Sequence, residues 1–211
     1  VLRLKNAAQI ILFNGQSGEY LCKILEIRRK AVRVEIEKFI DRSVESNLKI
    51  CLGLGISRGD RMDFSVQKAV ELGATEITPL ITQRCVVQFS DEKKSQRCEH
   101  WQKISQHAAE QSGRTVLPDF SPISTLAAWV GEQSGLKVFL DPHAEKNLAQ
   151  LCPENNLVTL LTGPEGGFSD QEREIAKAAG FIPVRLGARI LRTETASLAA
   201  LAAVQMLWGD F

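Results

Sequence analysis

From Leu48 to the end of the chain, short apolar segments alternate with helical patterns, and this alternation most constrains the fold. Strand candidates such as ICLGLGI and LVTLLTG are each followed by a helix candidate, RMDFSVQKAVELG or SDQEREIAKAAG. Strands that are joined by helices run parallel, and helices cover both faces of such a sheet. The sequence therefore predicts an α/β domain whose ligands bind at the carboxyl edge of the sheet.

Residues 10–39, which precede this pattern, read as β structure throughout. The segments IILFNG, YLCKILEIRR and AVRVEIEKF are rich in β-branched residues, and Asn14-Gly15 is a turn signal. They predict a small meander or part of a barrel, while the first residues, VLRLK, fit the end of either a strand or a helix. We place the domain boundary in the polar stretch DRSVESN, which gives domains of residues 1–40 and 41–211.

Composition and charge limit the classes of partner. The chain has 211 residues, with 26 Lys or Arg against 25 Asp or Glu, so its net charge is +1. A nearly neutral chain contacts RNA only through local patches. The basic clusters are Arg28, Arg29, Lys30 and Arg33, and Lys93, Lys94 and Arg97. No apolar run is long enough to span a bilayer and no signal peptide is present, so we expect no membrane partner.

The cysteines and histidines give no metal pattern. The five cysteines contain no C-x-x-C pair, and His100, His107 and His143 are not joined by a familiar ligand spacing. Scattered, unpaired thiols fit a reducing compartment, so we expect a cytoplasmic protein. We predict no metal site and interpret the histidines as ordinary surface or core residues.

Two loops near the C-terminus are the strongest candidates for a binding site. Gly163-Pro164-Glu165-Gly166-Gly167 joins a strand to a helix, and its glycines allow a ligand to approach the backbone closely. Arg189–Ala196 follows the next strand and also opens into a helix, whose N-terminal N–H groups favour an anionic or polar ligand. Each loop alone fits an ordinary connection, but together they predict a ligand pocket at one sheet edge.

Other motifs give weaker alternatives. Gly55–Gly59 matches the G-x-S-x-G pattern with Ser57 as nucleophile, although Asp141 and His143 lie only two residues apart, which is poor geometry for a triad. We keep a serine hydrolase as an alternative hypothesis. The glycines of this region resemble the G-x-G-x-x-G pattern of dinucleotide-binding proteins, but the interval before the last glycine is one residue too long. GPEGGFSD lacks the Lys-Ser/Thr pair of a P-loop.

The last helical segment is apolar on nearly every side, as its sequence ETASLAALAAVQMLWG shows. A helix that faces solvent would carry a polar stripe. This one is therefore buried either in the core or against a second subunit, and we favour a dimer interface.

Four blocks of the sequence together resemble one family. They are RMDFSVQKAVELGATEITPLITQR, HAAEQSGR, LLTGPEGGFSDQE and LGARILRTETASLAAL. They resemble the RsmE family of SPOUT-class methyltransferases, which modify N3 of a uridine in 16S ribosomal RNA. The resemblance covers residues 60–211 strongly and the preceding β segments loosely.

The resemblance implies a fold and a set of partners. The α/β domain should be a parallel sheet with a C-terminal trefoil knot, an exception to the rule against knots. It should follow a PUA-like β-barrel for RNA, and we expect the first strands of that barrel to be missing at the start of this chain. S-adenosyl-L-methionine should bind in the knot as cofactor, and 16S rRNA of the small ribosomal subunit should be the substrate of a homodimer. The alternative is an RNA-binding ribosome-assembly factor without catalytic turnover.

The resemblance also assigns roles to residues. A guanidinium near uracil N3 would stabilise the anion that forms when N3 loses its proton; the candidates are Arg192 and Arg114, the latter from the other subunit. Glu165 or Glu194 accepts that proton or orients an arginine. The cofactor positions are Leu161, Thr162, Gly163, Pro164, Glu165, Gly166, Leu186, Gly187, Ile190, Leu191, Arg192, Thr193, Thr195 and Ala196. The RNA-side positions are Arg28, Arg29, Arg61, Gln67, Lys68, Arg84, Glu110, Gln111 and Arg114.

Overall fold

The computed structural model describes residues 4–85 and 90–211, so most of the predicted VLRLK element lies outside the described residues. The chain divides into two compact units. The first contains the residues up to Glu45 together with Ala109–Leu117, and the second contains Ser46–Ala108 and Pro118–Phe211.

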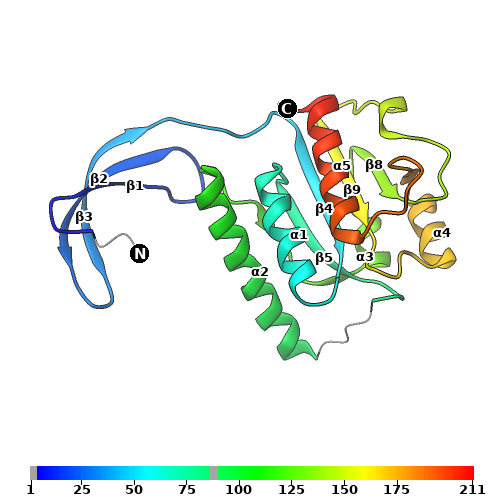
Figure 1. The fold of residues 1–211 in the computed structure, drawn as a ribbon, viewed down its shortest axis with the longest axis horizontal. Helices are drawn as coiled ribbons and strands as arrows, with labels where there is room; N and C mark the ends of the chain where they lie inside the picture. Colours follow the sequence, from blue (N-terminus) through cyan, green and yellow to red (C-terminus); the bar gives the residue numbers. More distant parts are fainter. Residues whose placement is uncertain (1–3, 86–89) are drawn as a thin grey trace. The chain divides into compact units, whose positions relative to one another are not determined.

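The first unit is built on an antiparallel sheet of three strands in the order β1-β2-β3 (Figure 1). The strands are β1 (Gln9–Leu12), β2 (Glu19–Ile27) and β3 (Val32–Ile40). Gly15, in the loop after β1, has a φ of 79°, a left-handed conformation that glycine adopts easily. The sheet confirms the predicted β segments, and it is the part of the chain that fits a PUA-like domain.

The second unit is built on a parallel sheet in the order β10-β8-β9-β4-β5-β6, with β7 also paired to β5. All of these pairs are parallel, which confirms the predicted sheet. The strands are β4 (Lys49–Gly55), β5 (Glu76–Ile81), β6 (Asp119–Phe120), β7 (Ser124–Thr125), β8 (Leu136–Leu140), β9 (Leu157–Thr162) and β10 (Ile182–Val184). The helices are α1 (Asp60–Glu71), α2 (Asp91–Ser112), α3 (Leu126–Val130), η1 (Leu148–Gln150), α4 (Asp170–Ala178) and α5 (Thr193–Trp208).

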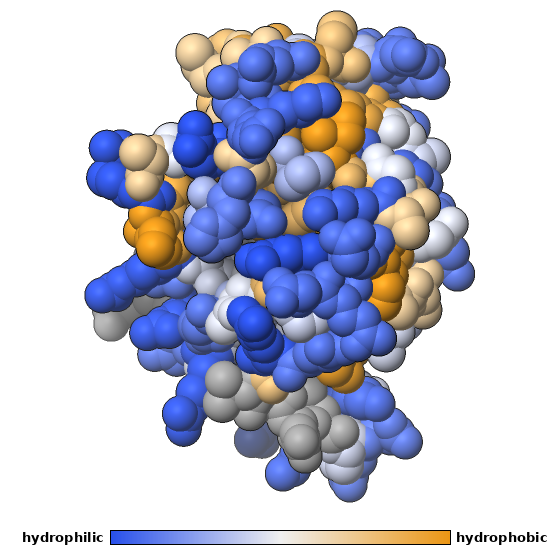
Figure 2. Space-filling model, turned by 90° about the vertical axis from the view of Figure 1, so that its right-hand side faces the viewer, coloured by the Kyte–Doolittle hydropathy of each residue, from blue (hydrophilic) through white to orange (hydrophobic). Residues whose placement is uncertain are grey.

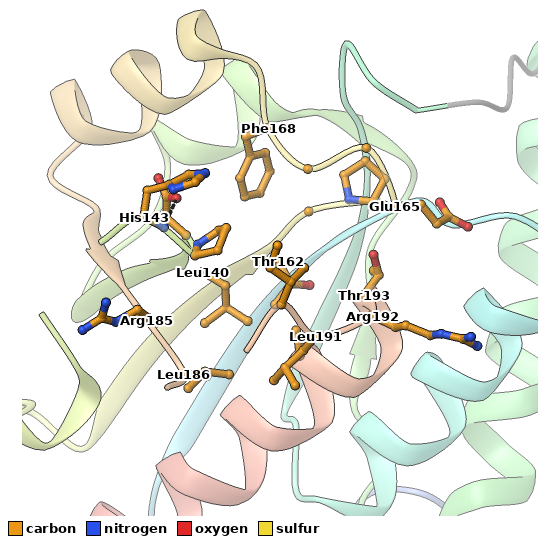
Figure 3. Close-up of a pocket in the computed structure, with 18 of the residues that line it drawn as sticks. Leu140, His143, Thr162, Glu165, Phe168, Arg185, Leu186, Leu191, Arg192 and Thr193 are labelled. Carbon is orange, nitrogen blue, oxygen red and sulfur yellow. Dashed lines mark hydrogen bonds between the residues drawn. The ribbon is translucent and has the colours of Figure 1, made fainter. Parts of the chain in front are cut away.

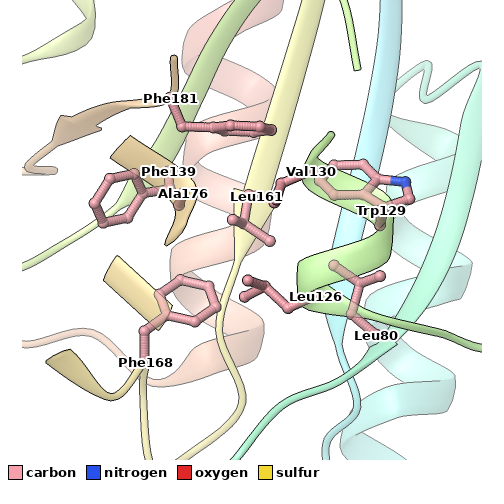
Figure 4. Close-up of a cluster of buried hydrophobic side chains, with 9 residues drawn as sticks. All are labelled: Leu80, Leu126, Trp129, Val130, Phe139, Leu161, Phe168, Ala176 and Phe181. Carbon is pink, nitrogen blue, oxygen red and sulfur yellow. The ribbon is translucent and has the colours of Figure 1, made fainter. Parts of the chain in front are cut away.

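Helices cover both faces of this sheet. On one face α3 and α4 pack over side chains from β5, β8 and β9, and Figure 4 shows this cluster. Its members are Leu80, Leu126, Trp129, Val130, Phe139, Leu161, Phe168, Ala176 and Phe181, each at most 4% exposed. On the other face α1 packs against α5, and α5 contacts β9. Because both faces are buried, the strands are apolar runs without alternation, as the sequence predicted.

Local signals set the helix ends. Ser169 and Glu172 form a capping box at the start of α4, as the spacing of Ser and Glu in SDQE predicts. After α1 the chain turns at Gly73, whose φ is 83°. Gln205 of α5 is 1% exposed and donates from Nε2 to the carbonyl of Leu72, 3.1 Å away, so α5 is attached to the end of α1. The segment LAAWVGEQ reads as helical in the sequence, and in the structure the helix there, α3, ends at Val130.

The end of the chain returns from the sheet edge toward its centre. β10 is an edge strand, yet the helix that follows it, α5, contacts β9 and α1. Residues 185–192 make this return, and the trefoil knot that the resemblance implies in this region stays a prediction. The side of the molecule that carries α4 is mostly hydrophilic, with small apolar patches (Figure 2). No helix among the described residues has the length and apolar character needed to cross a membrane.

Candidate functional site

A cavity of about 610 Å³ lies at the carboxyl ends of three neighbouring strands. The registers pair Thr162 of β9 with Leu54 of β4, and Val184 of β10 with Leu140 of β8, so these strand ends lie along one edge. Leu140, Thr162 and Val184 line the cavity. The loops that follow β9 and β10 close it, which is the position expected for a ligand site in an open α/β sheet.

Most of the predicted cofactor residues line this cavity. They are Thr162, Gly163, Pro164, Glu165, Gly166, Leu186, Gly187, Ile190, Leu191, Arg192, Thr193 and Ala196. The predicted catalytic candidate Glu194 and the RNA-side candidates Arg61 and Arg84 line it as well. Leu161 does not: its side chain is fully buried in the apolar cluster of Figure 4. Thr195 is exposed and is not among the lining residues.

The loop after β8 forms a wall of the cavity that the sequence did not indicate. Asp141, Pro142 and His143 belong to it, directly after Leu140 at the end of β8. Phe168, Arg173, Val184 and Arg185 also line the cavity and were not predicted. The available signal was LKVFLDP, a strand that runs into a loop. Nothing in that signal says that β8 lies between β9 and β10, so its loop could not be assigned to the site.

The two ends of the cavity differ in chemistry (Figure 3). In this view Leu140, Leu186, His143 and Arg185 lie at one end, while Glu165, Arg192 and Thr193 lie at the other, with Thr162 and Leu191 between them. The leucines suit a flat apolar group such as a purine ring. The arginines Arg61, Arg84 and Arg192 favour a polar or anionic group.

Two side-chain oxygen atoms of the cavity wall are buried without a hydrogen-bond partner among the described residues. They are Oγ1 of Thr162, a residue that is 1% exposed, and Oε2 of Glu194 in the first turn of α5. A buried polar atom without a partner is unfavourable, and such atoms are rare in folded proteins. Their position in one cavity indicates that a ligand with hydrogen-bonding groups binds there.

Glu165, in contrast, already has partners. Its Oε1 accepts hydrogen bonds from the backbone N–H of Arg58 at 3.0 Å and from Nη1 of Arg61 at 3.2 Å. Burial alone would raise the pKa of Glu165, but the hydrogen bonds from the backbone N–H groups of Arg58 and Glu165 and from Arg61 outweigh burial and hold the pKa below its ordinary value. Glu165 therefore attaches the start of α1 to the loop after β9.

Three further contacts fix the same loop. Nη1 of Arg84 donates to the carbonyl of Gly166 at 3.1 Å. Glu172, which is 4% exposed, accepts hydrogen bonds from the backbone N–H groups of Gln83 at 2.7 Å and of Ser169 at 2.9 Å. A Cβ atom on Gly55 would lie 2.6 Å from the nitrogen of Pro164, so only glycine allows this close approach. The loop is therefore held in place before any ligand binds.

The remaining predicted residues are not among the residues that line this cavity. Arg114 belongs to the first unit, is 5% exposed and makes a bidentate pair with Glu45, with Nε–Oε1 and Nη2–Oε2 distances of 3.0 and 2.6 Å. A guanidinium that is already paired with a carboxylate acts first as a structural group of that unit. Glu110 and Gln111 also belong to the first unit, with Arg28 and Arg29 in its sheet region. In the second unit, Gln67 is exposed and Lys68 pairs with Glu71.

The serine hydrolase hypothesis is wrong. Ser57 is 3% exposed, and its Oγ has no hydrogen-bond partner among the described residues, so no base activates it. Asp141 accepts a hydrogen bond from the backbone N–H of His143 and pairs with Arg173, which leaves no Ser-His-Asp arrangement. Within the described ranges, no group of three or more His, Cys, Asp or Glu side chains could hold a metal ion.

Comparisons with known proteins cover both units. A family model described as an RNA methyltransferase domain matches residues 44–205, and one described as an RNA methyltransferase PUA domain matches residues 1–37. Ribosomal RNA small subunit methyltransferase E of Buchnera aphidicola (subspecies Schizaphis graminum) is 37% identical over 212 residues, which cover 100% of this chain and 86% of that protein. The protein of the same description from Bacillus subtilis is 28% identical and is covered to 88%.

Solved structures of methyltransferases also match this chain. A ribosomal RNA small subunit methyltransferase E from Neisseria gonorrhoeae, bound to S-adenosyl methionine, matches with a TM-score of 0.93 and 39% identity. A structure from Legionella pneumophila, described as that of a methyltransferase with the cofactor SAM bound, matches with a TM-score of 0.95 and 40% identity. Each match covers 100% of this chain and 87% of the other chain.

Proposed function

The chain belongs to the RNA methyltransferase family that contains the ribosomal RNA small subunit methyltransferases E, and we propose that it uses S-adenosyl-L-methionine to methylate N3 of a uridine in 16S rRNA. The observation that carries the proposal is the cavity at the ends of β8, β9 and β10, with its buried, unpaired polar atoms. The alternative of a non-catalytic assembly factor is not supported, because the cavity is intact and two similar structures hold the methyl donor.

The residues of the cavity fit S-adenosylmethionine. Leu140 and Leu186, with Leu191 next to them toward the middle of the cavity, form an apolar surface that suits the adenine ring, and the unpaired Oγ1 of Thr162 can bind a polar group of the ligand. When bound, the cofactor supplies a methyl group on a positively charged sulfur, which is a good electrophile. Much of the remaining task of the protein is to hold the reacting groups in place, and the fixed loop after β9 does this.

Arg192 is our candidate for stabilising the uracil anion. It precedes α5 as the N-cap residue, its side chain makes no capping hydrogen bond, and it lines the cavity. Uracil N3 is a poor nucleophile until it loses its proton, and a nearby guanidinium lowers the pKa of that N–H group by favouring the anion. Because the side chain is exposed, its removal should leave the fold unchanged.

The rest of the RNA site is proposed from position and charge. Arg61 and Arg84 line the arginine-rich side of the cavity and are positioned to contact phosphates around the target nucleotide. Arg28, Arg29, Gln67, Lys68, Glu110, Gln111 and Arg114 are the remaining proposed RNA-side residues. We place the enzyme in the cytoplasm, acting on the small ribosomal subunit.

We also propose a homodimer through α5. Met206 and Leu207 near the end of this helix are 67% and 43% exposed, and the following Phe211 is 58% exposed. Exposed apolar side chains that gather at one site are typical of protein–protein interfaces. These residues would be buried by a second copy of the chain, as the apolar sequence of the helix suggested.

Arg192→Ala tests the proposed function. We expect methyl transfer to small subunits that lack the modification to fall by about 10²–10³-fold, as for loss of one donor that acts in the transition state. Binding of S-adenosylmethionine, measured by calorimetry, and the circular dichroism spectrum should not change. Arg189→Ala, which removes another arginine of the same loop, is the matched control. Normal turnover by Arg192→Ala would remove Arg192 from the mechanism.

A further inference from the structure

Three carboxylates line the cavity, Asp141, Glu165 and Glu194. Asp141 is paired with Arg173 and with the backbone N–H of His143, and the fold treats the two glutamates differently. Glu165 is held by the backbone N–H of Arg58 and by Arg61, and these hydrogen bonds lower its pKa. A carboxylate with a lowered pKa is a weaker base, since Brønsted behaviour ties proton affinity to pKa. Glu165 is therefore poorly suited to take a proton from a substrate, although it is well placed to hold Arg61.

Glu194 has the opposite surroundings. Its Oε2 is buried and has no hydrogen-bond partner among the residues that the structure describes. It is the second residue of α5, directly after Thr193, and it lines the same cavity as Arg192. A buried carboxylate oxygen is costly to leave unpaired, so its natural partner is a donor that arrives with a ligand.

We propose that Glu194 accepts the proton from N3 of the target uridine, and that Glu165 is a positioning residue that holds Arg61 and the start of α1 against the loop after β9. This inference rests on the proposed function. In the step, the N3–H bond breaks, its electron pair stays on N3, and the proton is held on Oε2 of Glu194. Arg192 meanwhile faces the negative charge that develops on the uracil ring.

The surroundings of Glu194 agree with a donor from the substrate. The cavity side with Arg192 and Thr193 is the polar one, opposite the leucine end that suits adenine (Figure 3). Thr162, 1% exposed, lines the same cavity and also has an unpaired side-chain oxygen, so a polar ligand is expected there. The competing partner for Glu194 is the ammonium group of the methyl donor itself, and this makes a different prediction for binding.

The test compares Glu194→Gln with Glu165→Gln. In the absence of ligands, Glu194→Gln should raise the Tm by about 2–4 °C, because the carboxylate whose buried Oε2 has no partner is replaced by a neutral amide. Its affinity for S-adenosylmethionine, measured by calorimetry, should stay within about twofold of wild type. The single-turnover rate of methyl transfer should fall by about 10²–10⁴-fold, the usual contribution of a general base, and recover in part at alkaline pH.

Glu165→Gln should behave in the opposite way. Its Tm should fall, because two hydrogen bonds to a carboxylate are weakened, and its affinity for the methyl donor should fall with it. At saturating S-adenosylmethionine its rate should stay within about tenfold of wild type, with an unchanged pH profile, because it touches no reacting atom. A change in its pH profile would show that Glu165 handles the proton.

Other outcomes overturn the inference separately from the proposed function. If Glu194→Gln binds S-adenosylmethionine about tenfold or more weakly and keeps its saturating rate, then Glu194 holds the ammonium group. If its Tm falls, then Glu194 has a structural contact in the free protein. If the wild-type enzyme methylates the subunit and the Glu194→Gln variant has the same rate and pH profile, the inference is refuted while the proposed function stands. A wild-type protein without transfer would refute both.

Discussion

Replacing Glu172 by alanine should destabilise the second unit and loosen the cavity. Glu172 is 4% exposed, and its two carboxylate oxygens accept one hydrogen bond each. One comes from the backbone N–H of Gln83, after β5, and the other from the backbone N–H of Ser169, after β9. A single side chain therefore joins the ends of two strands that lie on either side of β4.

The magnitude follows from these two bonds. Hydrogen bonds to charged groups contribute about 1.5–3 kcal/mol each. We use the low end, because removing the carboxylate also removes its own desolvation cost, and expect Glu172→Ala to lower the free energy of unfolding by about 3 kcal/mol. For a chain of this size, about 2–4 °C in Tm corresponds to 1 kcal/mol, so the Tm should fall by about 6–12 °C.

Urea unfolding followed by tryptophan fluorescence measures this loss. All three tryptophans, Trp101, Trp129 and Trp208, belong to the second unit, so the signal reports on that unit. Glu172→Gln keeps one acceptor oxygen and should lose about half as much stability. Glu174→Ala, which removes an exposed partner of Lys177 on the same helix, should change stability by at most about 0.5 kcal/mol. Equal stability of the Glu172→Ala and Glu174→Ala variants would refute the reasoning.

Three further changes test the construction of the cavity. Gly55→Ala should lower stability by about 1–3 kcal/mol in urea unfolding, because its Cβ would meet the nitrogen of Pro164 at 2.6 Å. Because the folded pKa of Glu165 is lowered, its hydrogen bonds stabilise the fold above the ordinary glutamate pKa, and this contribution is lost as the pH falls through the lowered value. In acid unfolding, the free energy of unfolding of wild type should exceed that of Glu165→Gln near neutral pH, and this difference should disappear at low pH. Gly187→Leu should weaken binding of S-adenosylmethionine in calorimetry. Gly187 lines the cavity, its φ of 81° is unfavourable for leucine, and a side chain there would occupy space that is open in the structure.

Features that depend on neighbouring residues could be predicted from the sequence. Ser169 and Glu172 form the expected capping box, and Gly73 adopts the expected left-handed turn. The strands of the second unit were recognisable because both sheet faces are buried, which makes each strand a short apolar run. The two loops of the site could also be predicted, because glycines that directly follow a strand are a signal that depends only on neighbouring residues.

Features that depend on strand order could not be predicted in this way. The loop with Asp141 and His143 forms part of the cavity only because β8 lies between β9 and β10. The orientation of Leu161 away from the ligand could have been predicted from the sequence. Successive strand residues point to opposite faces, so Leu161 and Thr162 cannot both face the ligand. Assigning the whole motif to the cofactor ignored this alternation, and the structure places Leu161 in the apolar cluster.

The acidic residues of the site show why a motif cannot assign roles to residues of the same type. Glu165, Glu172 and Glu194 all belong to the two C-terminal blocks of the resemblance. The capping-box spacing distinguishes Glu172, but nothing in the sequence separates Glu165 from Glu194. The fold does so by using the hydrogen-bonding capacity of Glu165 and Glu172 within the protein. Oε2 of Glu194 remains without a partner among the described residues. A carboxylate that the protein has already paired contributes to stability and position, whereas one that it leaves buried and unpaired is available for chemistry.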